Sequence, residues 1–223
     1  MDILVIGSAK NLEECKSKFG GQHRYLFQED HQELGATLSN AEVVFDFRID
    51  EDPYQIESYQ EVTGKPVFLN TVKITLLELS AIANHKIPKP LFGFNGLSTF
   101  LNREILEVSM LNTDQLSVLR NTCDALNTKF LVVDDRVGLV TPRIICMIIN
   151  EAYYTVQEGT ATREDIDEAM KLGTHYPYGP FEWCSRIGID QVYELLEAVY
   201  EDTHDERYKI CPLLKREYLL LQG

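Results

Sequence analysis

A glycine after the first apolar run and a carboxylate after the second have the types and spacing of a nucleotide site. The run Ile3–Ile6 ends at Gly7, and Ser8 and Ala9 follow. In dinucleotide-binding folds, glycines at this turn let backbone N–H groups approach a pyrophosphate at a helix start. Glu29 lies 22 residues after Gly7, where a carboxylate would bind ribose hydroxyls. We predict that these four residues bind a cofactor; the alternative is an ordinary turn and an unrelated surface glutamate.

The cysteines and histidines show no spacing that is typical of a metal site. The chain has five of each, without CxxC, HxxxH or HExxH. We therefore predict no bound metal. The odd, scattered cysteines favour reduced thiols, and a catalytic thiol is the less favoured alternative. No apolar run is long enough to span a bilayer, and Met1 leads directly into a strand pattern, so the expected location is the cytoplasm.

The charge of the chain is strongly acidic. Its 21 Lys and Arg against 35 Asp and Glu give a net charge of -14. This balance argues against nucleic acid or an anionic membrane as the main partner. A small anionic ligand would instead need local donors, such as the N–H groups at a helix start.

The pattern of apolar residues predicts an α/β domain followed by an all-α domain, with a boundary near Arg136. Residues 1–136 alternate short apolar strands with short helical stretches, as a mainly parallel sheet requires. The predicted strands are Ile3–Ile6, Arg24–Phe27, Val43–Phe47, Val67–Asn70, Leu91–Phe94, Ile105–Met110 and Phe130–Val133. The predicted helices of this part are Asn11–Phe19, Tyr54–Val62, Thr75–Asn84 and Asp114–Leu126.

Residues 137–223 have helical periodicity. Thr141-Pro142 supplies a cap and a first-turn proline for a long helix that Gly159 stops. A capping box beginning at Thr162 opens the next helix, and Asp190–Tyr200 reads as another. Between them stands LGTHYPYGPFEW, residues 172–183, which is too broken for a helix and too aromatic for a solvent loop.

This part of the chain resembles the C-terminal domain of the NAD-dependent 3-hydroxyacyl-CoA dehydrogenases. Glu158 to Gly173 is similar to the family's E-G-x-A-x-x-E-D-I-D-x-A-M-K-L-G run, and Tyr176 to Glu182 to its Y-P-x-G-P-F-E segment. The resemblance implies that residues 172–183 form an interhelical turn whose Pro and Gly fix its shape. It also implies a reduced Rossmann-like domain in front of a helical substrate and dimerisation domain.

The first part resembles the same family more faintly. Asn70-Thr71 matches the asparagine-threonine that follows a strand in the family, and Gly93 to Val108 aligns with its G-L-H-F-F-N-P motif and the strand beyond. The resemblance implies hydride transfer between NAD and the C3 hydroxyl of a 3-hydroxyacyl-CoA. It places Glu107 at the catalytic glutamate, and Asn70, Thr71 and Pro142 at substrate-binding positions.

The position of the family's catalytic histidine is Asn95. An amide has no titrating group near neutral pH, so it cannot take a proton as imidazole does. Only eleven residues separate Glu29 from Ala41, where the family inserts a strand and a helical hairpin. Two readings stay open: a divergent, shortened dehydrogenase of fatty acid metabolism, and a catalytically silent relative that binds nucleotide or acyl-CoA or serves as an interaction module.

The helical part also predicts self-association. Its apolar faces hold more large side chains than one helix needs, and the resemblance implies a homodimer through these helices. The alternative is that the same side chains form the core of their own domain. They are Ile144, Ile145, Ile148, Ile149 and Tyr153.

Overall fold

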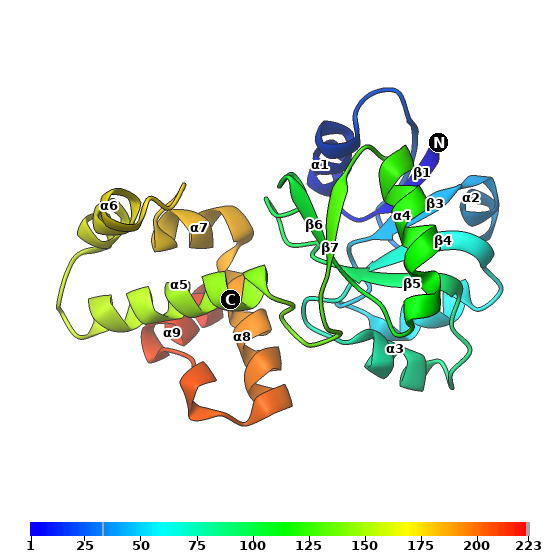
Figure 1. Ribbon diagram of the computed structural model, residues 1–223. Helices are drawn as coiled ribbons and strands as arrows, with labels where there is room; N and C mark the ends of the chain where they lie inside the picture. The colour runs from blue at the N-terminus through cyan, green and yellow to red at the C-terminus, as the bar shows by residue number, and fades with distance from the viewer. Residues whose placement is uncertain (33, 222–223) are drawn as a thin grey trace. The chain divides into compact units, whose positions relative to one another are not determined.

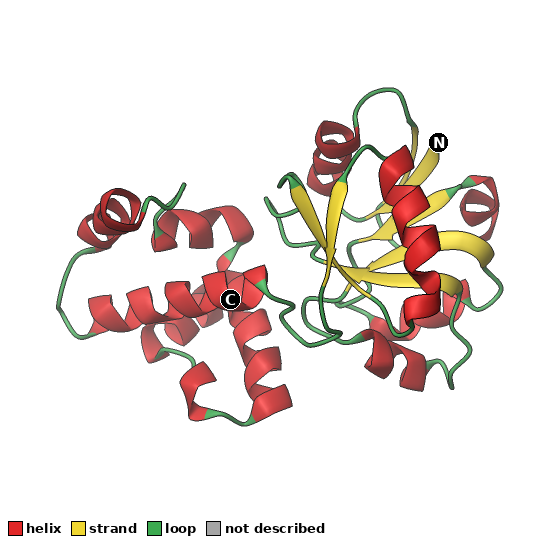
Figure 2. Ribbon diagram, in the orientation of Figure 1, coloured by secondary structure: helices red, strands yellow, loops and turns green. Residues whose placement is uncertain are grey.

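The computed structural model describes residues 1–32 and 34–221 and divides into two compact units (Figure 1). The sheet unit spans Met1–Leu139, and the helical unit begins at Val140. The division follows Leu139, whereas the predicted boundary follows Arg136. The predicted order of an α/β domain followed by a helical domain is confirmed, and Figure 2 shows all strands on one side of this division.

The sheet unit contains one sheet of seven strands in the order β2-β1-β3-β4-β5-β6-β7. Neighbouring strands from β2 to β5 are parallel, but β6 runs antiparallel to β5 and parallel to β7. Residues 95–104 join β5 to β6, and this connection is shorter than the roughly dozen residues that a parallel crossover needs. The strands are β1 (Asp2–Ile6), β2 (Arg24–Gln28), β3 (Val43–Asp46), β4 (Thr63–Asn70), β5 (Lys89–Phe94), β6 (Ile105–Ser109) and β7 (Lys129–Val132).

Helices cover both faces of this sheet, which is why its central strands are continuously apolar. On one face, α1 (Ala9–Phe19) and α4 (Leu116–Ala125) pack over a row of phenylalanines on β3, β4 and β5. On the other, α2 (Leu34–Asn40), the 3-10 helix η1 (Pro53–Tyr59) and α3 (Leu76–Ile82) pack over branched aliphatic side chains. Phe45 stacks on Phe68 with ring centroids 4.7 Å apart at the centre of the first layer.

Two local expectations in this unit were wrong. The predicted helix Tyr54–Val62 is the 3-10 helix η1, and α2 was not predicted at all. The sequence of α2, LGATLSN, is rich in weak helix formers, so packing of Leu34 and Leu38 against the sheet decides its conformation. A second short 3-10 turn, η2 (Thr113–Gln115), precedes α4.

The helical unit surrounds α5 (Thr141–Gln157), the long predicted helix. Ile145, Ile149 and Tyr153 of α5 are buried in this unit's own core. The other elements are α6 (Arg163–Thr174), α7 (Pro180–Ile187), α8 (Ile189–Thr203), η3 (Glu206–Tyr208) and α9 (Pro212–Leu221). Among the residues described, no helix is both long and apolar enough to cross a membrane.

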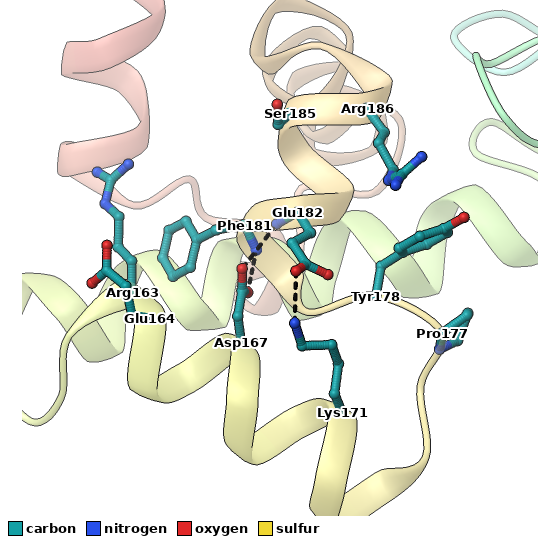
Figure 3. A pocket seen from close by; sticks show the side chains of 10 residues that line it. All are labelled: Arg163, Glu164, Asp167, Lys171, Pro177, Tyr178, Phe181, Glu182, Ser185 and Arg186. Atoms are coloured by element: carbon teal, nitrogen blue, oxygen red, sulfur yellow. Dashed lines mark hydrogen bonds and ion pairs between the residues drawn. The ribbon is translucent and has the colours of Figure 1, made fainter.

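Residues 172–183 include the end of α6, a short connection and the first turn of α7, so their second half is helical rather than broken. The carboxylate of Asp167 on α6 accepts the N–H groups of Phe181 and Glu182 at 2.8 and 3.1 Å (Figure 3). A side chain at Gly179 would lie 2.3 Å from a carboxylate oxygen of Asp167. Tyr178 meets Trp183 edge to face at 5.0 Å. The segment therefore joins α6 to α7. Asp167 caps the start of α7, and Gly179 leaves room for the Asp167 carboxylate because it has no side chain.

Two glycines of this segment provide a matched test. We expect Gly179→Ala to destabilise the chain by about 1–3 kcal/mol, because the new methyl group overlaps Asp167. Gly173→Ala should instead stabilise it by about 0.5–1 kcal/mol, because Gly173 lies in α6 with open space around it. Thermal unfolding of both variants measures the difference. Equal shifts of the same sign would contradict this account of the turn.

Candidate nucleotide and substrate site

The turn between β1 and α1 is closed by its own side chains. Ser8 caps α1 by accepting the Asn11 N–H at 3.3 Å, and Asn11 Oδ1 accepts the Ser8 N–H at 2.8 Å. A side chain at Gly7 would lie 3.1 Å from the Phe47 Cβ, so glycine lets β1 and β3 approach closely here. Ser8 and Ala9 are exposed at the start of the helix. The turn keeps the shape of an anion site, although Asn11 occupies one of its donors.

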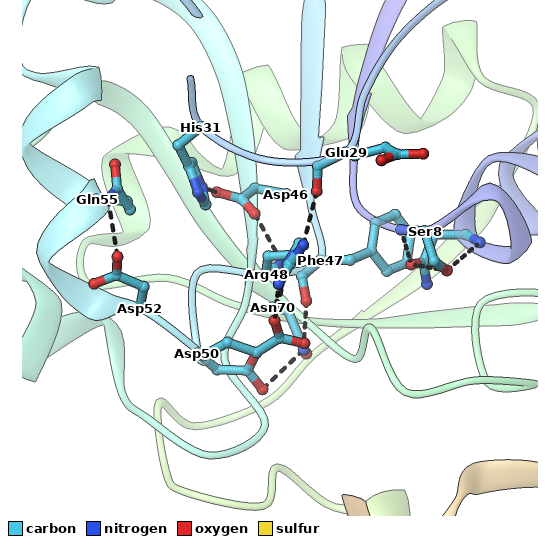
Figure 4. Close-up of polar contacts among 12 residues, drawn as sticks. Ser8, Glu29, His31, Asp46, Phe47, Arg48, Asp50, Asp52, Gln55 and Asn70 are labelled. Atoms are coloured by element: carbon cyan, nitrogen blue, oxygen red, sulfur yellow. Dashed lines mark hydrogen bonds and ion pairs between the residues drawn. The ribbon is translucent and has the colours of Figure 1, made fainter. Parts of the chain in front are cut away.

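Glu29 lies just beyond the end of β2, at the same edge of the sheet as Gly7 (Figure 4). Its carboxylate is exposed and makes no hydrogen bond or ion pair with the described residues. Its backbone carbonyl accepts a hydrogen bond from Arg48 Nη1 at 3.0 Å, and Arg48 also pairs with Glu51 at 2.8 Å. The Glu29 carboxylate can accept a hydrogen bond, and the guanidinium of Arg48 is already paired with Glu51. This position therefore suits a ligand hydroxyl better than a phosphate.

A buried triad of His31, Asp46 and Tyr59 lies next to this edge of the sheet. It was not predicted from the sequence. Asp46 Oδ2 lies 2.7 Å from His31 Nε2 and accepts the Tyr59 hydroxyl at 2.8 Å, while Oδ1 accepts the Arg48 N–H at 2.8 Å (Figure 4). Burial and the nearby Asp46 charge raise the pKa of Tyr59, so its hydroxyl stays protonated and donates. The one feature of the sequence that could have indicated this triad is Asp46, an aspartate at the end of the otherwise apolar strand β3.

His31 also lines a small polar pocket of about 270 Å³ between the segments that follow β2 and β3. Arg48 and Gln55 lie on its other walls, together with three carboxylates. The first residue that lines the pocket, Asp30, comes directly after Glu29, so the pocket lies near the carboxyl ends of β2 and β3. Its lining residues are Asp30, His31, Gln32, Arg48, Glu51, Asp52 and Gln55.

Asn70, at the end of β4, is buried and fully engaged within the chain. Its Nδ2 donates to the Phe47 carbonyl at 3.2 Å and to Asp50 Oδ2 at 2.9 Å, and its Oδ1 accepts the Gly96 N–H at 3.0 Å. The neighbouring Thr71 is also buried, and its hydroxyl has no hydrogen-bond partner among the described residues. Of these two predicted substrate contacts, only the Thr71 hydroxyl has unused hydrogen-bonding capacity.

Asn95 and Glu107 lie next to the last paired residues of β5 and β6. Gly93 pairs with Ser109 and Phe94 with Val108; Asn95 follows Phe94, and Glu107 precedes Val108. Asn95 is 4% exposed, and its Oδ1 accepts the Leu97 N–H at 3.2 Å. Glu107 is half-buried. The fold thus brings an amide and a glutamate to the end of one strand pair, at the positions where the resemblance implied a histidine and a glutamate.

The remaining predicted residue, Pro142, belongs to the helical unit. It is buried in the first turn of α5, where a proline costs no helical hydrogen bond. A shallow cavity of about 830 Å³ lies between α6 and α7 of this unit (Figure 3). Lys171 pairs with Glu182 there at 2.6 Å, so part of its charge is already balanced. No group of metal-binding side chains occurs among the residues that the structure describes.

The edge of the sheet fits an adenine dinucleotide in two respects. The carboxylate of Glu29 is exposed and can accept ribose hydroxyls, and the first turn of α1, where a helix has its positive end, is exposed at Ser8 and Ala9. Contacts run from this turn to the Asn95 loop through Phe47, which packs near Gly7, and Asn70, which holds Gly96.

Comparisons with known proteins agree with this architecture. Residues 138–220 match the family described as "3-hydroxyacyl-CoA dehydrogenase, C-terminal domain". The chain is 42% identical over 93 residues to the 3-hydroxyadipyl-CoA dehydrogenase of Escherichia coli K12, covering 42% of this chain and 20% of that protein. It is 31% identical over 150 residues to a probable 3-hydroxybutyryl-CoA dehydrogenase of Bacillus subtilis, covering 66% and 52%.

The fold extends this similarity over nearly the whole chain. The crystal structure of FadB2 from M. tuberculosis has a TM-score of 0.77 at 18% identity and covers 99% of this chain and 94% of its own. At that identity the match speaks for the fold alone. The chain spans about half the length of the curated relatives it matches. Residues 138–220 thus match the C-terminal domain of the 3-hydroxyacyl-CoA dehydrogenase family, and the sequence relatives extend the similarity to this family beyond that domain.

Proposed function

We propose that the chain is an NAD-dependent oxidoreductase that transfers hydride between NAD and the C3 hydroxyl of a 3-hydroxyacyl-CoA. The observation that carries the proposal is the pairing of β5 with β6, beside whose last pair Asn95 and Glu107 lie, and the support beside it is that Gly7 and Glu29 follow the ends of the parallel strands β1 and β2. The curated relatives are dehydrogenases of 3-hydroxyacyl-CoA compounds by name, which supports this substrate class and a place in fatty acid metabolism.

Each predicted residue has a part in this proposal. Glu29 accepts ribose hydroxyls, and Gly7, Ser8 and Ala9 surround the pyrophosphate at the start of α1. NAD, when bound, accepts the hydride from C3. Glu107 takes the hydroxyl proton, because Asn95 cannot, and returns it in the reverse direction. Thr71 and Pro142 lie at family positions for substrate, while Asn70 acts through its hold on Gly96.

A second function is favoured by one specific observation. Both N–H bonds of the Asn70 amide, and the Asn95 carbonyl, are engaged within the chain, and neither side chain titrates. Such side chains hold the loops of the site in place, but they leave few hydrogen-bonding groups for the hydroxyl of a substrate. The alternative is therefore a catalytically silent relative that binds nucleotide or acyl-CoA, or that serves as a dimeric interaction module.

Restoring an imidazole at position 95 separates the two functions. We expect wild-type protein to oxidise NADH with acetoacetyl-CoA slowly, and Asn95→His to be about 10²–10⁴-fold faster, because imidazole supplies the missing acid and base beside Glu107. Glu107→Gln should remove activity in both backgrounds, whereas Glu61→Gln, at an exposed glutamate elsewhere, should not. Folded protein that binds NADH without turnover in any variant would favour the silent relative.

Cofactor choice depends on Glu29 in this proposal. Glu29→Gln should weaken NADH binding by about tenfold, since a hydrogen bond to a charged acceptor is lost. It should also narrow the preference for NADH over NADPH, because the carboxylate that repels a 2′-phosphate is gone and Arg48 lies close by. Fluorescence titration with both nucleotides measures this, with Glu61→Gln as the control. An unchanged ratio would exclude Glu29 from the ribose site.

We further propose a homodimer formed through the helical unit, in the cytoplasm. The five cysteines are free thiols, which suits a reducing compartment. Of the five apolar residues predicted for the interface, Ile145, Ile149 and Tyr153 are buried within their own unit, but Ile144 is 53% exposed. Leu219, Leu220 and Leu221 of α9 are also exposed, as an apolar surface awaiting a partner would be.

Sedimentation velocity tests this assembly. Wild-type protein should sediment as a dimer, and Ile144→Glu should shift it toward monomer, because a charge at an apolar interface is costly to desolvate. Tyr54→Glu is the matched control, since Tyr54 is an exposed apolar residue of the sheet unit. A wild-type monomer, or a dimer that Ile144→Glu leaves intact, would contradict the proposed interface.

A further inference from the structure

The side-chain amide of Asn70 joins the exits of three strands. Asn70 itself ends β4, its Nδ2 reaches the Phe47 carbonyl and Asp50 after β3, and its Oδ1 holds the Gly96 N–H after β5. The contact is close, because a side chain at Gly96 would lie 2.7 Å from the Asn70 carboxamide carbon. The position of Gly96, and of Asn95 before it, therefore depends on the rotamer of one amide.

Asp50 is the charged group that helps to fix that rotamer. Its carboxylate accepts from Nδ2 of Asn70, as the Phe47 carbonyl does, and the two ends of an amide have opposite hydrogen-bonding roles. The Asp50 side chain is 1% exposed, and Lys73 Nζ lies 3.9 Å from its Oδ2. The other charged groups that act on it are the carboxylates of Glu51 and Asp46. Asp50 is thus a buried acid with one cation at the limit of ion-pair distance.

Burial raises the pKa of Asp50 to about 7, against the lowering effect of Lys73. The carboxyl group therefore changes its charge near neutral pH. An ionised carboxylate holds an amide N–H more strongly than a neutral carboxyl group does. The hydrogen bond that orients Asn70 is consequently stronger above this pH than below it.

The loop after β5 has a second anchor on α1. Glu14 is buried, and its Oε1 accepts the Thr99 N–H at 2.9 Å and the Ser98 hydroxyl at 3.3 Å. Thr99 is held there with a positive φ of 76°, which a β-branched residue rarely adopts. The loop is therefore held near its middle by Glu14, and the hydrogen bond from the Gly96 N–H to Asn70 holds the part that follows β5.

We propose that Asp50 is a positioning residue that, through Asn70, holds the loop bearing Asn95 in a proton-sensitive way. This inference rests on the proposed function for its catalytic meaning. We call the hydrogen-bonded group of Asp50, Asn70 and Gly96 the clamp. The clamp is a property of the fold, and it can be measured without cofactor or substrate. Protonation of Asp50 loosens the near end of the loop, and ionisation tightens it.

Exchanging the two side chains tests the clamp. In Asn70→Asp, two carboxyl groups face each other, so we expect about tenfold faster hydrogen exchange at the Gly96 amide at pH 8. The effect should be smaller at pH 6, where Asp50 is largely protonated. Combining Asn70→Asp with Asp50→Asn restores an amide that donates to a carboxylate, so exchange at Gly96 should move back toward the wild-type rate at both pH values; the hydrogen bond to the Phe47 carbonyl is not restored.

Asp50→Asn alone provides a test that does not depend on folding of the more disruptive variant. The folded chain holds the Asp50 proton more tightly than the unfolded chain, so this stabilising contribution is present below about pH 4 and lost as pH rises through about 7. The midpoint of thermal unfolding should fall over that range in wild-type protein, and less in Asp50→Asn. Glu61→Gln, at an exposed glutamate elsewhere in the sheet unit, should keep the wild-type profile.

The outcomes separate the clamp from the proposed reaction. Unchanged Gly96 exchange in Asn70→Asp, or loss that the double exchange does not restore, would overturn the clamp whatever the enzyme does. If the clamp holds, the Asn95→His variant gives the catalytic readout. Adding Asp50→Asn to it should weaken the rise of kcat between pH 6 and 8 and leave the KM for NADH unchanged, because Asp50 acts on the loop and not on Glu29.

Discussion

Parallel pairing of the central strands is the constraint on which the rest of the molecule depends. When β1, β3, β4 and β5 run in the same direction, all their carboxyl ends meet at one edge of the sheet. Helices bury both faces, so polar chemistry is confined to that edge. Gly7, Asp46, Asn70 and Asn95 each stand where a strand ends, and their proximity follows from the topology rather than from their spacing in the sequence.

Polar groups gathered at a partly buried edge must find hydrogen-bond partners, because an unsatisfied buried group costs about 1–3 kcal/mol. Here most of them find partners within the chain. Asp46 is satisfied by His31, Tyr59 and Arg48, and Asn70 by residues that follow β3 and β5. This internal satisfaction stabilises the loops around the site. It also reduces the number of polar groups at this edge that are left for a ligand.

The short connection after β2 gives the sheet unit its own character. The helix α2 is the one helix or strand described between β2 and β3, and β2 is the edge strand of the sheet. The same connection brings His31 onto Asp46 and leaves a polar pocket beside Arg48. A shortened loop therefore has a chemical consequence, because residues that the family separates with a strand and a helical hairpin lie here against β3.

The sequence by itself determined the class of the fold, the seven strands and the family, because buried strands, capping boxes and the Y-P-x-G-P-F-E segment are local patterns. It also placed Gly7 and Glu29 at consecutive strand ends. Only tertiary structure decided that β6 runs antiparallel to β5, with Phe94 opposite Val108, and that 53–59 is a 3-10 helix. The His31–Asp46–Tyr59 triad and the Asp50–Asn70–Gly96 clamp were likewise beyond the sequence. Each joins residues from different strand exits, and such pairing depends on which strands are neighbours in the sheet.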